Sequence, residues 1–228
     1  MNKTLVIIPA RSGSKGLKNK NILMLNKKPL IHYTIDVARK VFNDEIIRVS
    51  TDSKKIKSIA EQTGIKVGSL RPKILSQDNT SSYDVIMHEI NNYEKLNGSL
   101  EKVILLQPTS PLRKPKHILE SLKLFNNKID MVVSVKKSHS NPYFNLFEED
   151  KNGYLIKSKK SNFIRRQDCP NSWEYNGSIY IINVKSLKSK NFNEFKKIKK
   201  YVMTDYYSID IDNEIDFKLC KILLDENR

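Results

Sequence analysis

Short apolar runs alternate with amphipathic segments from residue 4 to about residue 136. Buried parallel strands read as continuous apolar runs, and each one needs a crossover, usually a helix, to reach the next. The alternation therefore predicts a parallel β-sheet covered by helices on both faces. Strands are expected at residues 4–10, 45–53, 65–70, 103–106 and 130–137. Helices are expected at residues 29–42, 54–64, 81–96 and 116–125.

Three unusual loops follow predicted strands directly. "ARSGSKG" follows the first strand, "STDS" follows the second, and "QPTSPLR" follows the strand at 103–106. In open α/β sheets, ligands bind outside the carboxyl ends of the strands. These loops are therefore the predicted place of a binding site.

The alternation stops at about residue 137. Residues 141–158 suggest a hairpin with the turn Lys151-Asn152-Gly153, and residues 162–177 are irregular, aromatic and charged. A strand returns at 178–184, and the chain ends in a short acidic strand and a helix. The 228 residues fit one domain, 1–228, with an insertion at 137–176.

The chain carries 41 basic and 25 acidic residues, a net charge of +16. This charge fits solvated surface lysines, a polyanionic small substrate, or nucleic acid. No apolar run approaches the 18 or so residues that a membrane span needs, and the N-terminal run is too short for a signal peptide. Two distant cysteines without a metal-binding spacing suit a reducing compartment, so we expect a cytoplasmic protein.

The first loop combines glycines with positive charge. Backbone N–H groups of a glycine-containing turn can face an anion, and Arg11, Lys15 and Lys20 would neutralise phosphate charge. The alternative is a solvated basic loop. Neither G-x-x-x-x-G-K-[ST] nor G-x-G-x-x-G is present, so a phosphate site here would be of another kind.

The stretch "SIDIDNEID" alternates Asp210 and Asp212 with isoleucines. On a strand this period puts both carboxylates on one face. Like charges side by side are unfavourable unless a cation lies between them, and Mg²⁺ bound with substrate phosphates is the natural choice. The alternative is an acidic helix start, with Asp212 as the cap.

Two further segments offer polar groups. Gln107, Thr109 and Ser110 lie between two prolines and suit a sugar or ribose hydroxyl, or simply form a rigid turn. The pair Arg165-Arg166 suits a carboxylate ligand, or is an exposed basic loop. Nucleotidyl transfer or a nucleotide-dependent kinase reaction is indicated by these features together: the basic loop, the paired carboxylates and the loop that can bind a hydroxyl group.

The segments "IIPARSGSKGLKNKNI", "VSTDS", "LRPKIL", "LLQPTSPLR", "NGSIYI" and "SIDIDNEID" occur in the order found in bacterial acylneuraminate cytidylyltransferases, the CMP-sialic acid synthetases. The chain resembles this family from about residue 4 to 224. The resemblance implies a Rossmann-like three-layer α/β sandwich with a mostly parallel sheet. It also implies that the insertion at 137–176 swaps across a homodimer. CTP and a nine-carbon 2-keto acid sugar would then give a CMP-sugar and pyrophosphate, with Mg²⁺.

The same resemblance assigns residues. The nucleotide-binding positions are Arg11, Ser14, Lys15, Lys20, Asn21, Arg71, Ser81 or Ser82, Gln107, Pro108, Thr109 and Ser110. The sugar-site positions are Gln107, Arg166, Asn176 and Tyr180, and the metal carboxylates are Asp210 and Asp212. Arg11, Lys15, Lys20 and Asp212 are the expected catalytic residues, because cations and metal stabilise the charge of the phosphoryl centre and leaving group. Asp212 or a metal-bound water is the candidate proton acceptor.

Two segments depart from the sialic acid pattern. "NPYFNL" and "NSWEYNG" carry aromatic residues where those enzymes often have a lysine and an arginine. "NPYFNL" is more similar to legionaminic acid synthetases. The alternatives that remain open are an eight-carbon sugar (3-deoxy-manno-octulosonate) cytidylyltransferase and a basic nucleic-acid-binding module. We expect no nucleic acid and no membrane among the partners.

Overall fold

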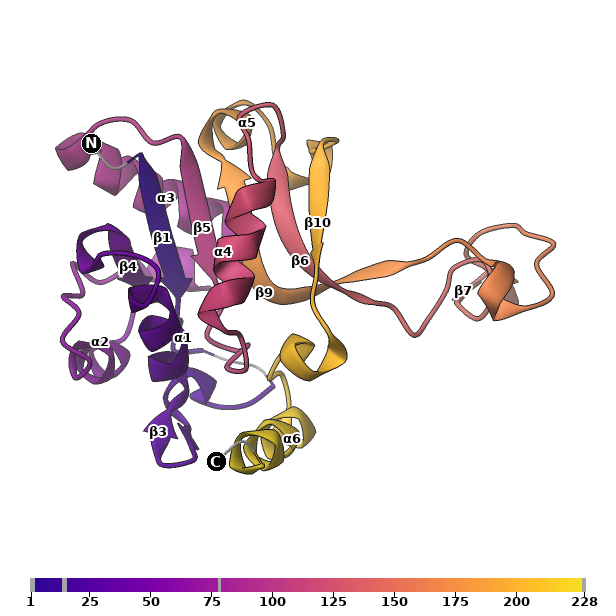
Figure 1. Ribbon diagram of the computed structural model, residues 1–228, viewed down its shortest axis with the longest axis horizontal. Helices are drawn as coiled ribbons and strands as arrows, with labels where there is room; N and C mark the ends of the chain where they lie inside the picture. The colour runs from indigo at the N-terminus through magenta and orange to yellow at the C-terminus, as the bar shows by residue number, and fades with distance from the viewer. Residues whose placement is uncertain (1–2, 14–15, 78, 227–228) are drawn as a thin grey trace.

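The computed structural model describes residues 3–13, 16–77 and 79–226, and one six-stranded sheet lies at its centre (Figure 1). The strand order is β10-β6-β9-β5-β1-β4. Its members are β1 (Thr4–Pro9), β4 (Ile47–Ser50), β5 (Lys102–Leu106), β6 (Met131–Lys137), β9 (Trp173–Asn183) and β10 (Ile198–Val202). β9 lies between β5 and β6 and runs antiparallel to both of them. The other pairings, β1 with β4, β1 with β5 and β6 with β10, are parallel.

Helices cover both faces of this sheet, as the alternation predicts. One face packs against α1 (Leu30–Arg39), α2 (Lys54–Glu61) and α4 (Pro115–Leu124), and the other against α3 (Ser82–Asn97) and α5 (Val184–Ser189). Successive β1 side chains point to opposite faces, so Val6 and Ile8 join the first layer while Leu5 and Ile7 join the second. The expected three-layer, mostly parallel α/β sandwich is confirmed.

The remaining elements are short or peripheral. They are β2 (Met24–Leu25), β3 (Lys28–Pro29), β7 (Phe147–Glu149), β8 (Leu155–Lys157) and the C-terminal helix α6 (Glu214–Asp225). Single 3₁₀ turns lie at Lys20–Ile22, Asp44–Ile46, Lys73–Ser76, Arg166–Asp168, Phe192–Glu194 and Asp205–Ser208. No helix in the described ranges is long and apolar enough to cross a membrane.

An arm leaves the body between β6 and β9 (Figure 1). It holds the hairpin β7–β8 near its tip, and the hairpin turn contains Gly153 at φ 84°, as the sequence predicts. Several of its large apolar side chains are exposed, among them Leu155 and Ile164 at 69% and 89%. The base of the arm is closed by a backbone hydrogen bond of 3.0 Å from Ser138 to Ser172. The break in the alternation thus corresponds to a segment that projects from the sandwich.

The expected strand at residues 65–70 is wrong. Ile65 and Val67 are buried, but groups from α2 take the backbone positions that a neighbouring strand would use. Lys57 Nζ donates to the Gly68 carbonyl at 2.8 Å, and Glu61 Oε1 accepts from the Val67 N–H at 3.3 Å. Apolar content alone could not distinguish this buried irregular segment from a strand.

Two other strand predictions also need correction. The expected acidic strand around Asp210 is an extended segment outside the sheet, held by a hydrogen bond of 2.9 Å from the Ile211 N–H to the Thr109 carbonyl. Conversely, β10 arises from the lysine-rich stretch at 198–202, which the sequence presents only as a basic cluster. Lysine is common on edge strands, where its charge opposes association with other strands.

Candidate functional site

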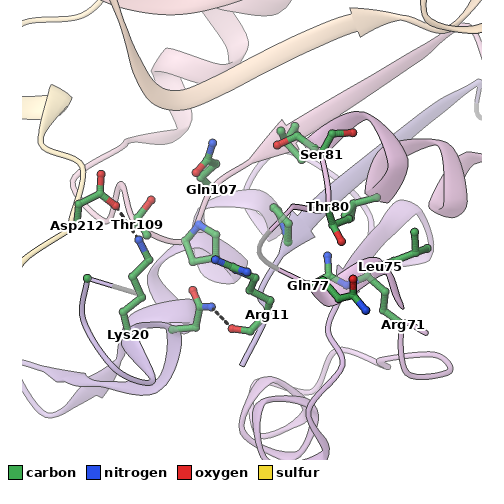
Figure 2. Close-up of a pocket in the computed structure, with 17 residues that line it drawn as sticks. Arg11, Lys20, Arg71, Leu75, Gln77, Thr80, Ser81, Gln107, Thr109 and Asp212 are labelled. Atoms are coloured by element: carbon green, nitrogen blue, oxygen red, sulfur yellow. Dashed lines mark hydrogen bonds and ion pairs between the residues drawn. The ribbon is translucent and has the colours of Figure 1, made fainter. Parts of the chain in front are cut away.

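A cavity of about 380 Å³ opens at the carboxyl ends of β1 and β5 (Figure 2). Lys20 and Asp212 lie at one end of it, Arg71 and Ser81 lie at the other, and Arg11 lies between the two ends. Its walls come from segments that are far apart in the sequence. This is the edge at which the three loops were expected to gather.

The side chain of Asn21 ties the end of the basic loop to its beginning, just after β1. Asn21 is 5% exposed, and its Nδ2 donates to the Arg11 carbonyl at 3.0 Å (Figure 2). Arg11, Lys20 and Asn21 all line the cavity. The predicted residues Ser14 and Lys15 lie outside the described residues.

Asp52 fixes the start of this loop, a role the sequence did not reveal. Its carboxylate accepts from the Ser12 N–H at 2.9 Å and from the Ser12 hydroxyl at 2.7 Å. Burial alone would raise the pKa of Asp52, but the Ser12 hydrogen bonds outweigh it and the pKa is lowered. Asp52 and Ser53 are both residue types that suit the cap of the helix that follows them. Ser53 alone caps α2, by accepting from the Ile56 N–H at 3.3 Å.

Asp212 faces the cavity and does not cap α6. The cap of α6 is Asn213, which forms a capping box with Asp216. The carboxylate of Asp212 instead binds Lys20 Nζ at 2.8 Å, and the same ammonium donates to the Ile211 carbonyl at 3.1 Å (Figure 2). The structure thus separates the two alternatives for "SIDIDNEID": the acidic residues after Asn213 serve the helix, and Asp212 belongs to the cavity.

Asp210 lies in a more buried position beside the same segment. Burial raises the pKa of its carboxyl, the Thr109 hydroxyl opposes this, and the charge of Asp212 adds to the rise. Among the described residues, no donor meets hydrogen-bond geometry with its buried Oδ1 atom. The carboxylate rests on Gly177, where a Cβ atom would lie 2.7 Å from Oδ2. The ionised form of Asp210 is therefore unfavourable in the metal-free protein, and close packing against Gly177 limits where its carboxylate can move.

This pair of carboxylates fits a divalent cation. An orphaned carboxylate oxygen and a second carboxylate two residues away are hard oxygen ligands of the kind that Mg²⁺ prefers when substrate phosphates complete its coordination. No group of three or more histidine, cysteine, aspartate or glutamate side chains in the described ranges is arranged to hold a metal. The cation would therefore depend on substrate oxygens.

Asp210 makes the stability of the metal-free protein depend on pH. Its folded-state pKa is raised, so the folded protein binds more protons than the unfolded chain in the window just above pH 3.8. In EDTA, we expect the free energy of unfolding of the wild type to fall relative to that of Asp210→Asn as pH rises from about 4 to 7. Urea denaturation of both proteins across this range measures it. Parallel pH curves would contradict the buried, ionised Asp210.

The opposite end of the cavity carries groups suited to a base and a ribose. Arg71 is 5% exposed, its N–H donates to the Thr51 carbonyl at 2.8 Å, and its Nε donates to Ser76 at 3.1 Å. Ser81 caps α3, and Ser81 and Ser82 both line the cavity. Gln77 and Thr80 line it too and were not predicted. They lie in a polar loop without a recognisable motif.

The "QPTS" loop forms the floor between the two ends (Figure 2). Gln107, Pro108 and Thr109 line the cavity. Ser110 is 1% exposed and does not belong to the lining, although the sequence grouped it with these three.

Of the predicted sugar positions, Gln107 lines the cavity, whereas Arg166, Asn176 and Tyr180 do not belong to its lining. Asn176 is buried: its Oδ1 accepts from the Ser134 hydroxyl at 2.6 Å, and its Nδ2 donates to the Ser208 hydroxyl at 2.9 Å. Tyr180 is half-buried, and burial first, then the charge of Asp210 and the nearby Tyr175, raise its pKa to about 12. Its ring meets Tyr175 edge to face at 6.2 Å. An aromatic pair therefore lies beside Asp210.

Arg166 lies on the arm, exposed to solvent. Its Nη2 donates a hydrogen bond of 3.5 Å to the Ser138 carbonyl, at the base of the arm. Within one chain it does not contribute to the cavity lining.

Comparison with protein families gives a match over residues 5–227 to the cytidylyltransferase model. The chain belongs to the cytidylyltransferase family. The family match takes in the basic loop, the "QPTS" loop and the segment of Asp210 and Asp212 together.

Individual relatives agree with membership of the cytidylyltransferases. An N-acylneuraminate cytidylyltransferase of Streptococcus agalactiae is 38% identical over 220 residues, which is 94% of this chain and 52% of that protein. The chain thus spans about half the length of the curated relatives it matches first. A CMP-N,N'-diacetyllegionaminic acid synthase of Campylobacter jejuni is 35% identical over 226 residues, 98% of this chain and 96% of that protein.

Among solved structures, a CMP:2-keto-3-deoxy-manno-octonic acid synthetase complexed with CTP has a TM-score of 0.73. The match covers the whole of both chains at 16% identity. At this identity the likeness concerns the fold. It confirms a Rossmann-like α/β fold for this cytidylyltransferase.

Proposed function

We propose that the chain transfers the cytidylyl group of CTP to a nine-carbon 2-keto acid sugar, an N-acylneuraminate or a legionaminate, and releases pyrophosphate. The observation that carries the proposal is the two-ended cavity, with Lys20 and Asp212 at one end, Arg71 and the start of α3 at the other, and Arg11 between them. Its family membership and the named relatives support the same reaction.

In this proposal CTP lies along the cavity. Arg71 and Ser81 hold the cytidine end, and Arg11 and Lys20 hold the phosphates. Asp210 and Asp212 would hold Mg²⁺, which supplies charge stabilisation when bound. The sugar hydroxyl oxygen forms a new bond to the α-phosphorus, its proton passes to the Asp212 carboxylate, and the bond to pyrophosphate breaks. Cationic side chains near the triphosphate stabilise the charge that develops on the leaving group.

Between the two sugars, the aromatic surroundings favour a legionaminate. Tyr175 and Tyr180 form a ring pair beside Asp210, and such a wall suits a less hydroxylated sugar. One relative of matching length is a CMP-N,N'-diacetyllegionaminic acid synthase. Cys169 and Cys220 are both free thiols, which suits a reducing compartment. We therefore place the enzyme in the cytoplasm, where CTP is available.

The test is pyrophosphate release from CTP or UTP with sialic, legionaminic, pseudaminic and 3-deoxy-manno-octulosonic acids. We expect release with CTP and Mg²⁺, and the highest kcat/KM with legionaminic acid. Activity on the eight-carbon acid alone would move the assignment to that sugar. Salt-dependent nucleic-acid binding without pyrophosphate release would favour a binding module instead.

We further propose that residues 137–176 mediate a homodimer within a single-domain chain. The arm projects from the body and exposes apolar side chains such as Leu155 and Ile164, which a second copy would cover. In that arrangement Arg166 would reach the partner's cavity, which would explain its distance from its own. Light scattering should give twice the chain mass of 26.5 kDa. A monomer at micromolar concentration would contradict the dimer.

A further inference from the structure

The backbone of Gln107 is held by an unusual concentration of donors. Its carbonyl oxygen accepts from Arg113 Nη1 and Nη2 and from Thr34 Oγ1, each at 3.3 Å. Gln107 lies in the floor of the cavity. These three side-chain donors, with the Ser110 N–H at 3.5 Å as a fourth, fix the direction of this peptide and with it the place from which the Gln107 side chain starts.

Arg113 is the centre of this arrangement. Its side chain is 1% exposed, which is exceptional for a residue that carries a permanent charge. Nη2 also donates to Thr34 Oγ1 at 2.8 Å, and Nη1 donates to the Ser178 carbonyl at 2.6 Å. The planar guanidinium thus joins three elements: the "QPTS" loop, α1 and β9.

The contact with Ser178 extends to the candidate metal carboxylates. Ser178 follows Gly177, on which Asp210 rests with no room for a Cβ atom. Asp210 also opposes the effect of burial on Arg113, whose pKa is lowered to about 9. The Arg113 guanidinium therefore binds both the residue next to Gly177, on which Asp210 packs, and the carbonyl of Gln107.

We propose that Arg113 is a positioning residue, which sets the placement of Gln107 relative to Asp210 by bonding the backbone of both the "QPTS" loop and β9. This inference rests on the proposed cytidylyl transfer and deepens it. Arg113 does not line the cavity, so it acts on the reaction only through these two elements. A displacement of about 1 Å at a reacting group can reduce turnover up to about a hundredfold.

Arg113→Lys separates charge from geometry. Lysine keeps the positive charge but has a single nitrogen, which cannot bridge Gln107, Ser178 and Thr34 as the guanidinium fork does. We expect kcat to fall about tenfold or more and KM for the sugar to rise. KM for CTP should stay within about threefold, because Arg71 and Ser81 at the cytidine end are held by Ser76 and Asp84, on elements that Arg113 does not join.

Thr34→Val tests the same carbonyl without touching the cation. It removes one donor to Gln107 and one acceptor of Arg113 while nearly conserving the side-chain volume. We expect a smaller loss of kcat with the same pattern of KM values. Because both residues act on one oxygen, the losses in the double variant should not add.

Arg48→Lys is the matched control. Arg48 also bonds backbone carbonyls, those of Glu45 and Ile47, but lies outside the cavity lining, so its kinetics should equal the wild type. Melting temperatures and amide exchange of peptides spanning 105–112 and 176–183 accompany the kinetics. We expect faster exchange in both peptides of Arg113→Lys.

The outcomes separate the two proposals. Lowered melting temperatures with kcat and both KM values within twofold of wild type would overturn the positioning role and reduce Arg113 to a structural residue. Wild-type protein that releases no pyrophosphate with any acid would overturn the proposed function. In that case unchanged exchange at 105–112 in Arg113→Lys would independently overturn the anchoring of Gln107.

Discussion

Asp212→Ala is expected to lower kcat by about a hundredfold or more, the range seen when a group that stabilises transition-state charge is removed. The carboxylate belongs to the cavity because Asn213, not Asp212, caps α6. Its loss leaves Asp210 as a single carboxylate and leaves Lys20 without its partner at 2.8 Å. Pyrophosphate release at saturating CTP and Mg²⁺ measures the effect.

This variant should fold normally. The Asp212 side chain is 71% exposed, and exposed ion pairs contribute at most about 1 kcal/mol. Mn²⁺ binding in the presence of CTP, followed by electron paramagnetic resonance, should weaken in parallel with turnover. Asp205→Asn changes another exposed carboxylate and should leave both measurements unaltered. Normal turnover by Asp212→Ala would overturn the metal assignment.

The sequence was most informative where local pattern and position agree. Strand and helix periodicity located β1, β4, β5 and β6 with the helices α1 to α4. The rule that ligands bind at carboxyl ends of strands then placed the site, since the loops after β1 and β5 both line the cavity. Local pattern fails for β10 and for residues 65–70, because edge position and side-chain contacts from α2 decide those segments.

The parts of the site that escaped prediction depend on contacts between distant segments. Arg113 reads as the end of a proline-rich loop, and only the fold shows that it meets Thr34 and Ser178, 79 and 65 residues away. Asp52 reads as a helix cap, whereas it holds Ser12. When a polar residue could serve either a local turn or a distant partner, the tertiary structure decides between them, and sequence periodicity carries no information about that choice.

Gly16 also depends on a contact between distant segments, and Gly16→Ala is the second variant with a large expected effect. A Cβ atom at Gly16 would lie 2.1 Å from the Asp212 carbonyl oxygen, so the basic loop and the segment of Asp212 must separate. Because Lys20 follows in the same loop, its contact with Asp212 should be lost as well. We expect kcat/KM for CTP to fall about a hundredfold, as displacement of reacting groups permits.

The effect should be confined to the site, because Gly16 is exposed and contributes no side chain to the core. Gly68→Ala is the matched control: no atom lies within 4 Å of its added Cβ, and Gly68 is outside the cavity lining. Steady-state kinetics and melting temperatures of both variants decide the point. A fully active Gly16→Ala protein would show that the basic loop and Asp212 need not approach each other for turnover. Loss of activity with an unchanged melting temperature would show that the glycine is needed for their close approach.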